Sequence, residues 1–319
     1  MSSVKIFSGK NSLKLAEKIA SRFGKRLGKT SSGKFSDGEL FFRYTETVRG
    51  CDVYIIQSTV DNSDSFMELF LMIDAAKRAS AKHVNIVIPY YGYARQDRKD
   101  KPRITISSKL IANLITSAGA SRVVSCDLHA GQIQGFFDIP LDHLHGSSVF
   151  VPYLKKLKTK KLIFGSPDAG GTERVRDYAK YFDVDFVICD KHRNKANKIK
   201  SMQVIGDVEG KDVVLVDDLI DTGGTACKAC ELLIKNGAKE VYMLACHGLF
   251  SGPAIDRINQ SSFKQIIVGN TIPTRKKVSE CDKIKIIDVS WICAEAIKRS
   301  IEGKSLNELY NSSEFKNYS

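Results

Sequence analysis

Short apolar runs rich in β-branched residues alternate along the chain with longer segments of helical periodicity. Nine of these runs, each with about four to seven apolar residues, have the length and composition of strands. They are DVYIIQS from 52, HVNIVIPYY from 83, RVVSCDLHA from 122, KLIFGSPDAG from 161, VDFVICD from 184, DVVLVDD from 212, EVYMLACH from 240, KQIIVGN from 264 and KIKIIDV from 283. Helical stretches such as 67–81 and 106–120 lie between several of them. Near-continuous apolar strands separated by helices predict α/β architecture, with mainly parallel sheets covered by helices on both faces.

The predicted strands fall into two groups that divide near residues 145–150, at the segment DHLHGSSVFVP. Nine strands exceed what one doubly wound sheet usually holds. Each group also contains an apolar run that ends in acidic residues, VVSCDLH in the first and VVLVDDLID in the second. We therefore predict two similar α/β domains, at 1–146 and 147–290. A C-terminal helix and tail at 291–319 are expected to return to the first domain.

With 319 residues, 43% of them hydrophobic, the chain can bury one large core or two ordinary ones. No apolar run approaches the roughly 18 to 20 residues that cross a bilayer, and the start MSSVKIFSGKNS lacks the apolar segment of a secretory signal. Eight scattered cysteines, mostly inside apolar runs, indicate reduced thiols and a cytoplasmic protein. Cys227 and Cys230 form a CxxC without a second pair at zinc-site spacing, so they are interpreted as core residues.

The formal net charge of +13 is concentrated in part in two basic runs, at 155–161 and 191–200. Such runs occur in nucleic-acid-binding proteins. However, no aromatic residues are interleaved with them, and the chain has no helix-turn-helix or zinc-finger pattern. A small polyanionic ligand accounts for a concentrated positive loop equally well. We predict neither a nucleic-acid partner nor a membrane partner, and the run 155–161 is interpreted as a solvated face.

The stretch VVLVDDLIDTGGTACKA at 213–229 combines acidic residues with a Gly/Thr-rich turn that opens a helix. The backbone amides of Thr222, Gly223, Gly224 and Thr225 can cradle a phosphate, because glycines let the backbone approach the oxygens closely. Asp217, Asp218 and Asp221 would repel that phosphate, but they can accept hydrogen bonds from sugar hydroxyls, directly or through Mg²⁺. The motif therefore predicts a sugar phosphate site. The structural alternative is a turn whose acids merely cap a helix.

In open α/β sheets, ligands lie at the carboxyl ends of the strands. Residues that follow the other apolar runs are therefore further candidates for the same surface. They are Arg95, Gln96, Asp127, His129, Asp168, Gly170, Gly171, Lys191 and Arg193.

VVLVDDLIDTGGT resembles the phosphoribosyl pyrophosphate motif of the type I phosphoribosyltransferase fold. Further motifs follow in order: FSDGE at 35–39, TVRG at 47–50, ASA at 79–81, YARQDRKDK at 93–101, DLHAGQIQGFFDIP at 127–140, SPDAGG at 166–171, IGDVEG at 205–210 and HGLFSGPA at 247–254. Together they resemble the phosphate-activated class of the phosphoribosyl pyrophosphate synthetase family (ribose-phosphate pyrophosphokinases). The resemblance covers residues 4–310 and implies two phosphoribosyltransferase-type domains.

The resemblance implies an enzyme of nucleotide biosynthesis that transfers the diphosphoryl group of MgATP to ribose 5-phosphate, giving phosphoribosyl pyrophosphate and AMP. The chain has no Walker A loop, since GKRLGKT at 24–30 is one residue too short. By resemblance, the adenine of ATP is bound by three residues that reach it from a neighbouring subunit, Phe35, Asp37 and Glu39. The other ATP-binding residues that the resemblance implies are Arg95, Gln96, Asp97, Arg98, Lys99, Asp100 and His129. The resemblance also implies that ribose 5-phosphate is bound by residues 217, 218 and 221–225.

By the same resemblance, metal ligands are expected at His129 and Asp168, with Asp127, Asp138 and Asp142 as further acids of the metal signature. Mg²⁺ prefers oxygen ligands, so His129 is also expected to contact ATP phosphates. Lys191 and Arg193 match the catalytic pair on a loop expected to close over ATP. We expect them to neutralise the charge that develops during transfer.

A regulatory site for the activator inorganic phosphate and the inhibitor ADP is implied at Thr47, Arg49, Ser80, Arg103 and Ser305. Thr47 and Asn307 stand where the family commonly has serine, which puts one hydroxyl contact, worth about 1 kcal/mol, in doubt. The family also implies hexamers built from dimers.

Two other functions fit part of the sequence. A non-catalytic regulatory homologue of the synthetase would be expected to lose the loop cations, the metal acids or the TGGT turn, and all of these are present. A base phosphoribosyltransferase would explain the motif at 213–229 but would leave FSDGE, RQDRKD and the first domain without a role.

The resemblance predicts that Lys191→Ala lowers kcat far more than it raises KM for either substrate, because the cation is expected to act mainly in the transition state. Steady-state kinetics on the purified variant measure both constants. Equal changes in kcat and KM, or no change in either, would contradict a catalytic role.

Overall fold

The computed structural model describes residues 3–60, 63–157, 159–193 and 199–310, and for residues 191–193 and 199–202 it describes the backbone only. Contacts group the chain into two compact units. Unit 1 contains residues 1–146, 271–273 and 289–309, whereas unit 2 contains residues 147–270 and 274–288 together with the chain from 310. Residues 289–309 thus belong to the first unit although they follow the second along the chain.

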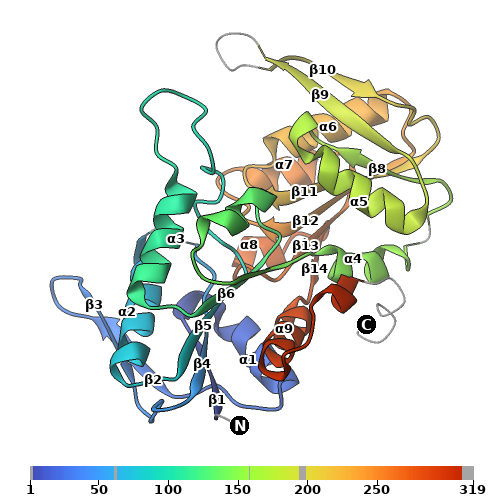
Figure 1. Ribbon diagram of the computed structural model, residues 1–319. Helices are drawn as coiled ribbons and strands as arrows, with labels where there is room; N and C mark the ends of the chain where they lie inside the picture. Colours follow the sequence, from blue (N-terminus) through green and yellow to red (C-terminus); the bar gives the residue numbers. More distant parts are fainter. Residues whose placement is uncertain (1–2, 61–62, 158, 194–198, 311–319) are drawn as a thin grey trace. The chain divides into compact units, whose positions relative to one another are not determined.

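Unit 1 is built on a five-stranded parallel sheet (Figure 1). In spatial order its strands are β1 (Val4–Ser8), β4 (Asp52–Ile56), β5 (His83–Ile88), β6 (Arg122–Cys126) and β7 (Leu141–Leu144). An antiparallel hairpin of β2 (Thr30–Lys34) and β3 (Leu40–Tyr44) lies outside this sheet. Because the five strands are parallel, their carboxyl ends all lie along one edge.

Helices cover both faces of the sheet in unit 1. On one face, α2 (Ser63–Arg78) and α3 (Ser107–Ala118) share a core cluster with the strands, in which Ile86 and Met72 are fully buried. On the other face, α1 (Leu13–Arg22) packs against α9 (Ser290–Glu302), and Arg22 Nε donates to Ser290 Oγ at 2.8 Å. The Sγ atom of Cys126 in β6 lies 3.9 Å from that of Cys293 in α9. Three 3-10 turns complete the elements, η1 (Lys10–Ser12), η2 (Gly131–Phe136) and η4 (Asn307–Tyr310).

Unit 2 contains a seven-stranded sheet, drawn in yellow to orange in Figure 1. Its spatial order is β10 (Ile199–Ile205), β9 (Phe186–Arg193), β8 (Leu162–Ser166), β11 (Asp212–Ile220), β12 (Glu240–Gly248), β13 (Phe263–Gly269) and β14 (Ile284–Ile287). The β9 and β10 strands pair antiparallel, and the other neighbours pair parallel. The helical elements are α4 (Ser147–Leu154), η3 (Ala169–Gly171), α5 (Thr172–Phe182), α6 (Gly224–Lys235), α7 (Ala254–Gln260) and α8 (Lys276–Ser279).

Alternate residues of the central strands in unit 2 serve two cores. Leu215 of β11 belongs to the cluster that α6 and α7 cover, where Leu233 is fully buried. Phe164 of β8 faces the opposite side and contacts two rings of α5, those of Tyr178 and Phe182, with ring centroids 6.0 and 5.2 Å away. The sheet is therefore buried on both faces, as expected for parallel strands with near-continuous apolar sequence.

The expected α/β class with parallel sheets and flanking helices is confirmed, and each of the nine apolar runs contains a strand. The structure adds β1, the β2–β3 hairpin, β7 and β10, which are short or carry many polar residues. All eight cysteines are buried and none forms a disulfide, and Cys227 and Cys230 lie in the unit 2 core. Among the helices of the described residues, none combines the length and apolar character that crossing a membrane requires.

Candidate active site

The Gly/Thr-rich turn of unit 2 connects β11 directly to α6. Gly223 precedes the helix with φ of 71°, a left-handed conformation that glycine adopts without strain. The first helical hydrogen bond runs from Cys227 N to Gly223 O at 2.9 Å. The amides of the residues between these two have no intrahelical partner, so the start of this 12-residue helix offers donors and the positive end of its dipole to an anion.

Arg257 of α7 lies beside this turn, and the sequence analysis did not identify it. Its Nη1 donates to the carbonyl oxygen of Thr222 at 3.0 Å. A Cβ atom built on Gly224 would lie 3.3 Å from the same nitrogen, so the guanidinium is close to both ends of the turn. The sequence signal is weak, because Arg257 is one cation in a short helix that lies well beyond the motif along the chain.

Two acids of the motif lie within β11 rather than after it. Asp217 pairs in register with Ala245 of β12, and Asp218 is only 4% exposed. Asp217 Oδ1 accepts a hydrogen bond from the amide of Asp218 at 2.9 Å. The strand thus continues through both acids and places them at the carboxyl edge of the sheet.

A third acid, Asp168, follows the adjacent strand β8. Its carboxylate accepts a hydrogen bond from Gly170 N at 3.0 Å, which caps η3. Gly171 follows, where a Cβ would come within 2.6 Å of Ser166 Oγ and 3.8 Å of Val216 O, so a larger residue would not fit against the strand ends.

The three carboxylates affect one another electrostatically. Burial, together with the negative charges of Asp218 and Asp168, raises the pKa of Asp217 to about 8. Carboxylates held together in this way are stabilised by a cation, and an all-oxygen donor set suits Mg²⁺. These residues therefore fit the metal that the resemblance implies.

The two expected catalytic cations lie on β9. In backbone register, Lys191 pairs with Met202 and Arg193 pairs with Ile199 of β10. The side chains of Lys191 and Arg193 lie outside the described part of the chain, as do residues 194–198.

In unit 1, the expected adenine residues form the tip of the β2–β3 hairpin. Phe35 N donates to Glu39 O at 2.8 Å, and the Asp37 carboxylate accepts from Glu39 N at 3.0 Å. The Phe35 ring is 58% exposed and lies 5.2 Å from the Phe41 ring, centroid to centroid. The tip of the hairpin thus holds an aromatic face and two carboxylates in solvent, whereas Phe42 and Tyr44 of β3 pack against the core of unit 1.

The expected nucleotide-binding stretch 95–100 follows β5 and is connected to η2. Gln132 Nε2 donates to Asp97 Oδ2 at 2.6 Å. Gln96 is held by the start of α3, since Ser108 N donates to its carbonyl oxygen at 3.2 Å. Arg95, Arg98, Lys99 and Asp100 are exposed. The structure thus connects this stretch to the segment that carries the exposed His129.

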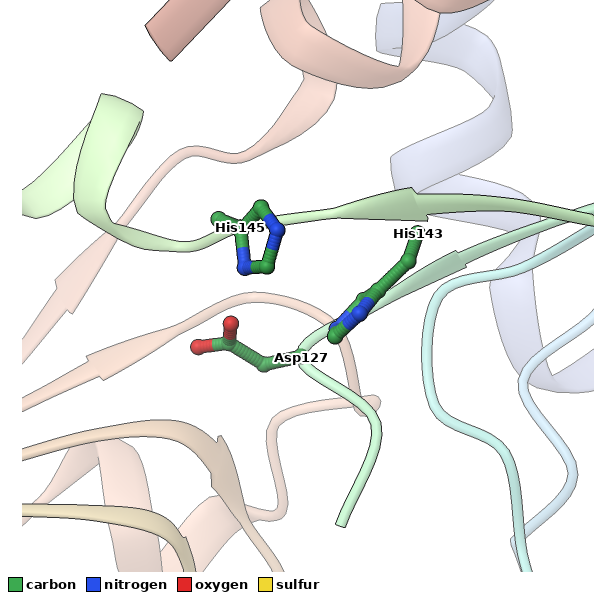
Figure 2. Close-up of side chains that lie close together, drawn as sticks. All are labelled: Asp127, His143 and His145. Carbon is green, nitrogen blue, oxygen red and sulfur yellow. The ribbon is translucent and has the colours of Figure 1, made fainter. Parts of the chain in front are cut away.

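The other expected metal residues of unit 1 have different surroundings. Asp138 lies 3.7 Å from Lys109 Nζ, and Asp142 lies 2.6 Å from Arg122 Nη1, so both acids are in ion pairs. Asp127 instead lies near His143 and His145, and one possible ligand atom from each of the three falls within 4.8 Å of the others. Figure 2 shows the carboxylate and the two rings converging from β6 and from β7 with the residues after it.

Three of the expected regulatory residues lie together. Arg49 donates through Nη1 to Ser80 Oγ at 3.2 Å and through its amide to Thr47 Oγ1 at 3.4 Å. Arg103 lies between β5 and α3, and Ser305 follows α9, where its Oγ accepts from Asn307 N. The first three residues therefore provide one guanidinium and two hydroxyls in a single exposed cluster.

A parallel strand that carries paired acids, followed by a glycine turn at a helix start, resembles the phosphoribosyl pyrophosphate motif of a phosphoribosyltransferase-type domain. A family model for the N-terminal domain of ribose phosphate pyrophosphokinase matches residues 4–119, and one for the phosphoribosyl synthetase-associated domain matches residues 184–311.

Relatives match over nearly the whole chain. A ribose-phosphate pyrophosphokinase of Porphyromonas gingivalis is 51% identical over 306 residues, covering 96% of this chain and 97% of that protein. A ribose-phosphate pyrophosphokinase of Fusobacterium nucleatum is 49% identical, covering 97% and 98%. The crystal structure of phosphoribosylpyrophosphate synthetase from Mycobacterium smegmatis has a TM-score of 0.89 at 35% identity, covering 94% of this chain and 99% of that one. The chain belongs to the ribose-phosphate pyrophosphokinase family.

We predict that Asp217→Asn raises the melting temperature of protein freed of divalent cations by EDTA. A carboxyl whose pKa is raised to about 8 in the folded state contributes to stability while it is neutral. This contribution is fully present below the pKa that the same carboxyl has in the unfolded state. That stability is lost as pH rises through the folded pKa. The melting temperature of the variant should therefore equal that of the wild type near pH 4 and be a few degrees higher above about pH 8.

Differential scanning calorimetry across this pH range measures the difference. Asp207→Asn is the matched control, because Lys211 lowers the pKa of this exposed carboxyl and its variant should gain nothing with rising pH. A gap between Asp217→Asn and the wild type that stays constant with pH would contradict the assignment.

Proposed function

We propose that this protein is a ribose-phosphate diphosphokinase, which transfers the diphosphoryl group of MgATP to ribose 5-phosphate and releases AMP. The observation that carries the proposal is the turn between β11 and α6, with its acids, in a chain that matches ribose-phosphate pyrophosphokinases over 96% of its length. Transfer of this kind depends on positioning and charge neutralisation rather than on a covalent protein intermediate.

In unit 2, the 5-phosphate of the sugar is assigned to the amides of residues 222–225. Asp217, Asp218 and Asp221 precede this turn and are assigned to the sugar hydroxyls. With the sugar held at both ends, the anomeric oxygen attacks the β-phosphorus of ATP. The bond from that phosphorus to the oxygen bridging to the α-phosphorus breaks, the hydroxyl proton is released, and AMP leaves.

In unit 1, the adenine is assigned to the Phe35 ring, which offers a face for stacking, and to the acceptors Asp37 and Glu39. The phosphates are assigned to the cations of the stretch 95–100 and to His129. Lys191 and Arg193 are assigned to neutralising charge in the transition state. Mg²⁺, when bound, would withdraw negative charge from the phosphate oxygens, and Asp168 is its proposed oxygen ligand from unit 2.

Regulation and assembly form part of the same proposal. The cluster of Thr47, Arg49 and Ser80 supports an anion site that inorganic phosphate occupies as activator, with ADP as inhibitor. Family membership supports hexamers built from dimers, and eight cysteines without a disulfide fit a reducing cytoplasm.

The decisive experiment incubates the purified protein with Mg²⁺, ATP and ribose 5-phosphate, with and without inorganic phosphate. We expect AMP to form only when ribose 5-phosphate is present and in proportion to the sugar phosphate consumed. ADP in place of AMP would indicate transfer of a single phosphoryl group. If the folded protein shows no turnover, the result would instead favour a regulatory homologue. The catalytic partner of that homologue would then have to be identified.

Arg257 provides a second prediction. Arg257→Ala removes the donor to Thr222 O and a positive charge beside the turn, so we expect KM for ribose 5-phosphate to rise about three- to tenfold. KM for ATP should change little, and Arg257→Lys should keep part of the effect. Lys235→Ala, which removes a cation from the other end of α6, is the control. An equal rise in both KM values would contradict a role at the turn.

A further inference from the structure

The turn after β6, residues 127–129, is held by the end of β7 and the residues after it through three hydrogen bonds. Asp127 N donates to Leu144 O at 2.8 Å, and Gly146 N donates to Asp127 Oδ1 at 3.0 Å. The third bond comes from a side chain: Leu128 N donates to His143 Nε2 at 2.9 Å. The proposed function uses His129 of this turn but gives no role to His143.

The turn is conformationally demanding. Asp127 has a φ of 34°, in the left-handed region that residues other than glycine rarely adopt. Such a backbone persists only where its surroundings hold it. Leu128 is 3% exposed, and its side chain belongs to the unit 1 core, whereas His129 is exposed. The core therefore holds the side chain of Leu128, and the imidazole of His143 holds the backbone amide of the same residue.

The convergence of Asp127, His143 and His145 also resembles a metal set (Figure 2). The bond from Leu128 argues against His143 as a ligand in this arrangement. An imidazole nitrogen that accepts an N–H bond uses the lone pair that a metal would need. The neutral ring then carries its proton on Nδ1, so that nitrogen has no lone pair to offer either. His143 is better suited to holding the turn than to holding an ion.

We propose that His143 is a positioning residue for His129, which it acts on through the Leu128 amide. The inference rests on the proposed function, in which His129 contacts the ATP phosphates or their metal. Loss of the acceptor would remove the side-chain hydrogen bond to the amide of Leu128 and weaken the hold on the left-handed turn. His129 would then be displaced from MgATP, while the ribose 5-phosphate turn in unit 2 would keep its structure.

The test compares His143→Leu, which removes the acceptor, with His143→Gln, whose side-chain carbonyl can replace Nε2. His83→Gln, which changes an exposed histidine at the start of β5, is the control. Calorimetric titrations measure the affinity for ribose 5-phosphate and for an ATP analogue with a methylene group between the α- and β-phosphorus atoms, which cannot be cleaved. Both are run with Mg²⁺, together with kcat and KM values and melting temperatures.

We expect His143→Leu to weaken analogue binding about five- to tenfold and to lower kcat, with ribose 5-phosphate affinity within about twofold of the wild type. His143→Gln should recover most of both losses. Equal weakening of both ligands, or wild-type behaviour of His143→Leu, would overturn the proposal, as would a folded Gln variant without recovery. Binding of Zn²⁺ to the wild type that both His143 variants lose would also overturn it and favour a metal site. If the wild type makes no AMP but binds the analogue, the proposed reaction fails while the titrations still test His143.

Discussion

Parallel pairing is the constraint on which both units depend. It sets the carboxyl ends of the parallel strands along one edge of a sheet, so residues that are far apart in sequence come together there. In unit 2 this brings Asp168, which follows β8, near Asp217 of β11, and burial together with the charges of Asp218 and Asp168 raises the pKa of Asp217. In unit 1 it brings the turn after β6 next to the residues that follow β7.

The acids and the turn in unit 2 have opposite electrostatic preferences. The start of α6 and the guanidinium of Arg257 favour an anion, whereas the three carboxylates favour a cation or hydrogen-bond donors. A ligand with phosphate at one end and hydroxyls at the other satisfies both, and a phosphate alone would satisfy one. The charge distribution therefore suits the phosphorylated sugar that the proposed function assigns to this site.

The sequence predicts the sheets and the phosphate turn well, because apolar runs and glycine-rich turns are local signals. β1, β7 and β10 are missed, since each is short or interrupted by polar residues and becomes a strand through pairing with a longer neighbour. Arg257 and His143 are missed for a related reason. Each acts on a backbone group of another segment, Thr222 O and Leu128 N, and no local pattern indicates such a partner. The roles of Lys191 and Arg193 remain predictions from sequence resemblance.

Because all eight cysteines are buried, their reactivity can be used to measure local opening of the two cores. Three of them, Cys51, Cys126 and Cys293, lie in unit 1, and the other five lie in unit 2. A thiol inside a closed core reacts with an alkylating reagent only when that core opens, so the rate of modification reports a local opening equilibrium. Mass spectrometry of the alkylated peptides can thus distinguish a ligand that stabilises one unit from a ligand that stabilises both.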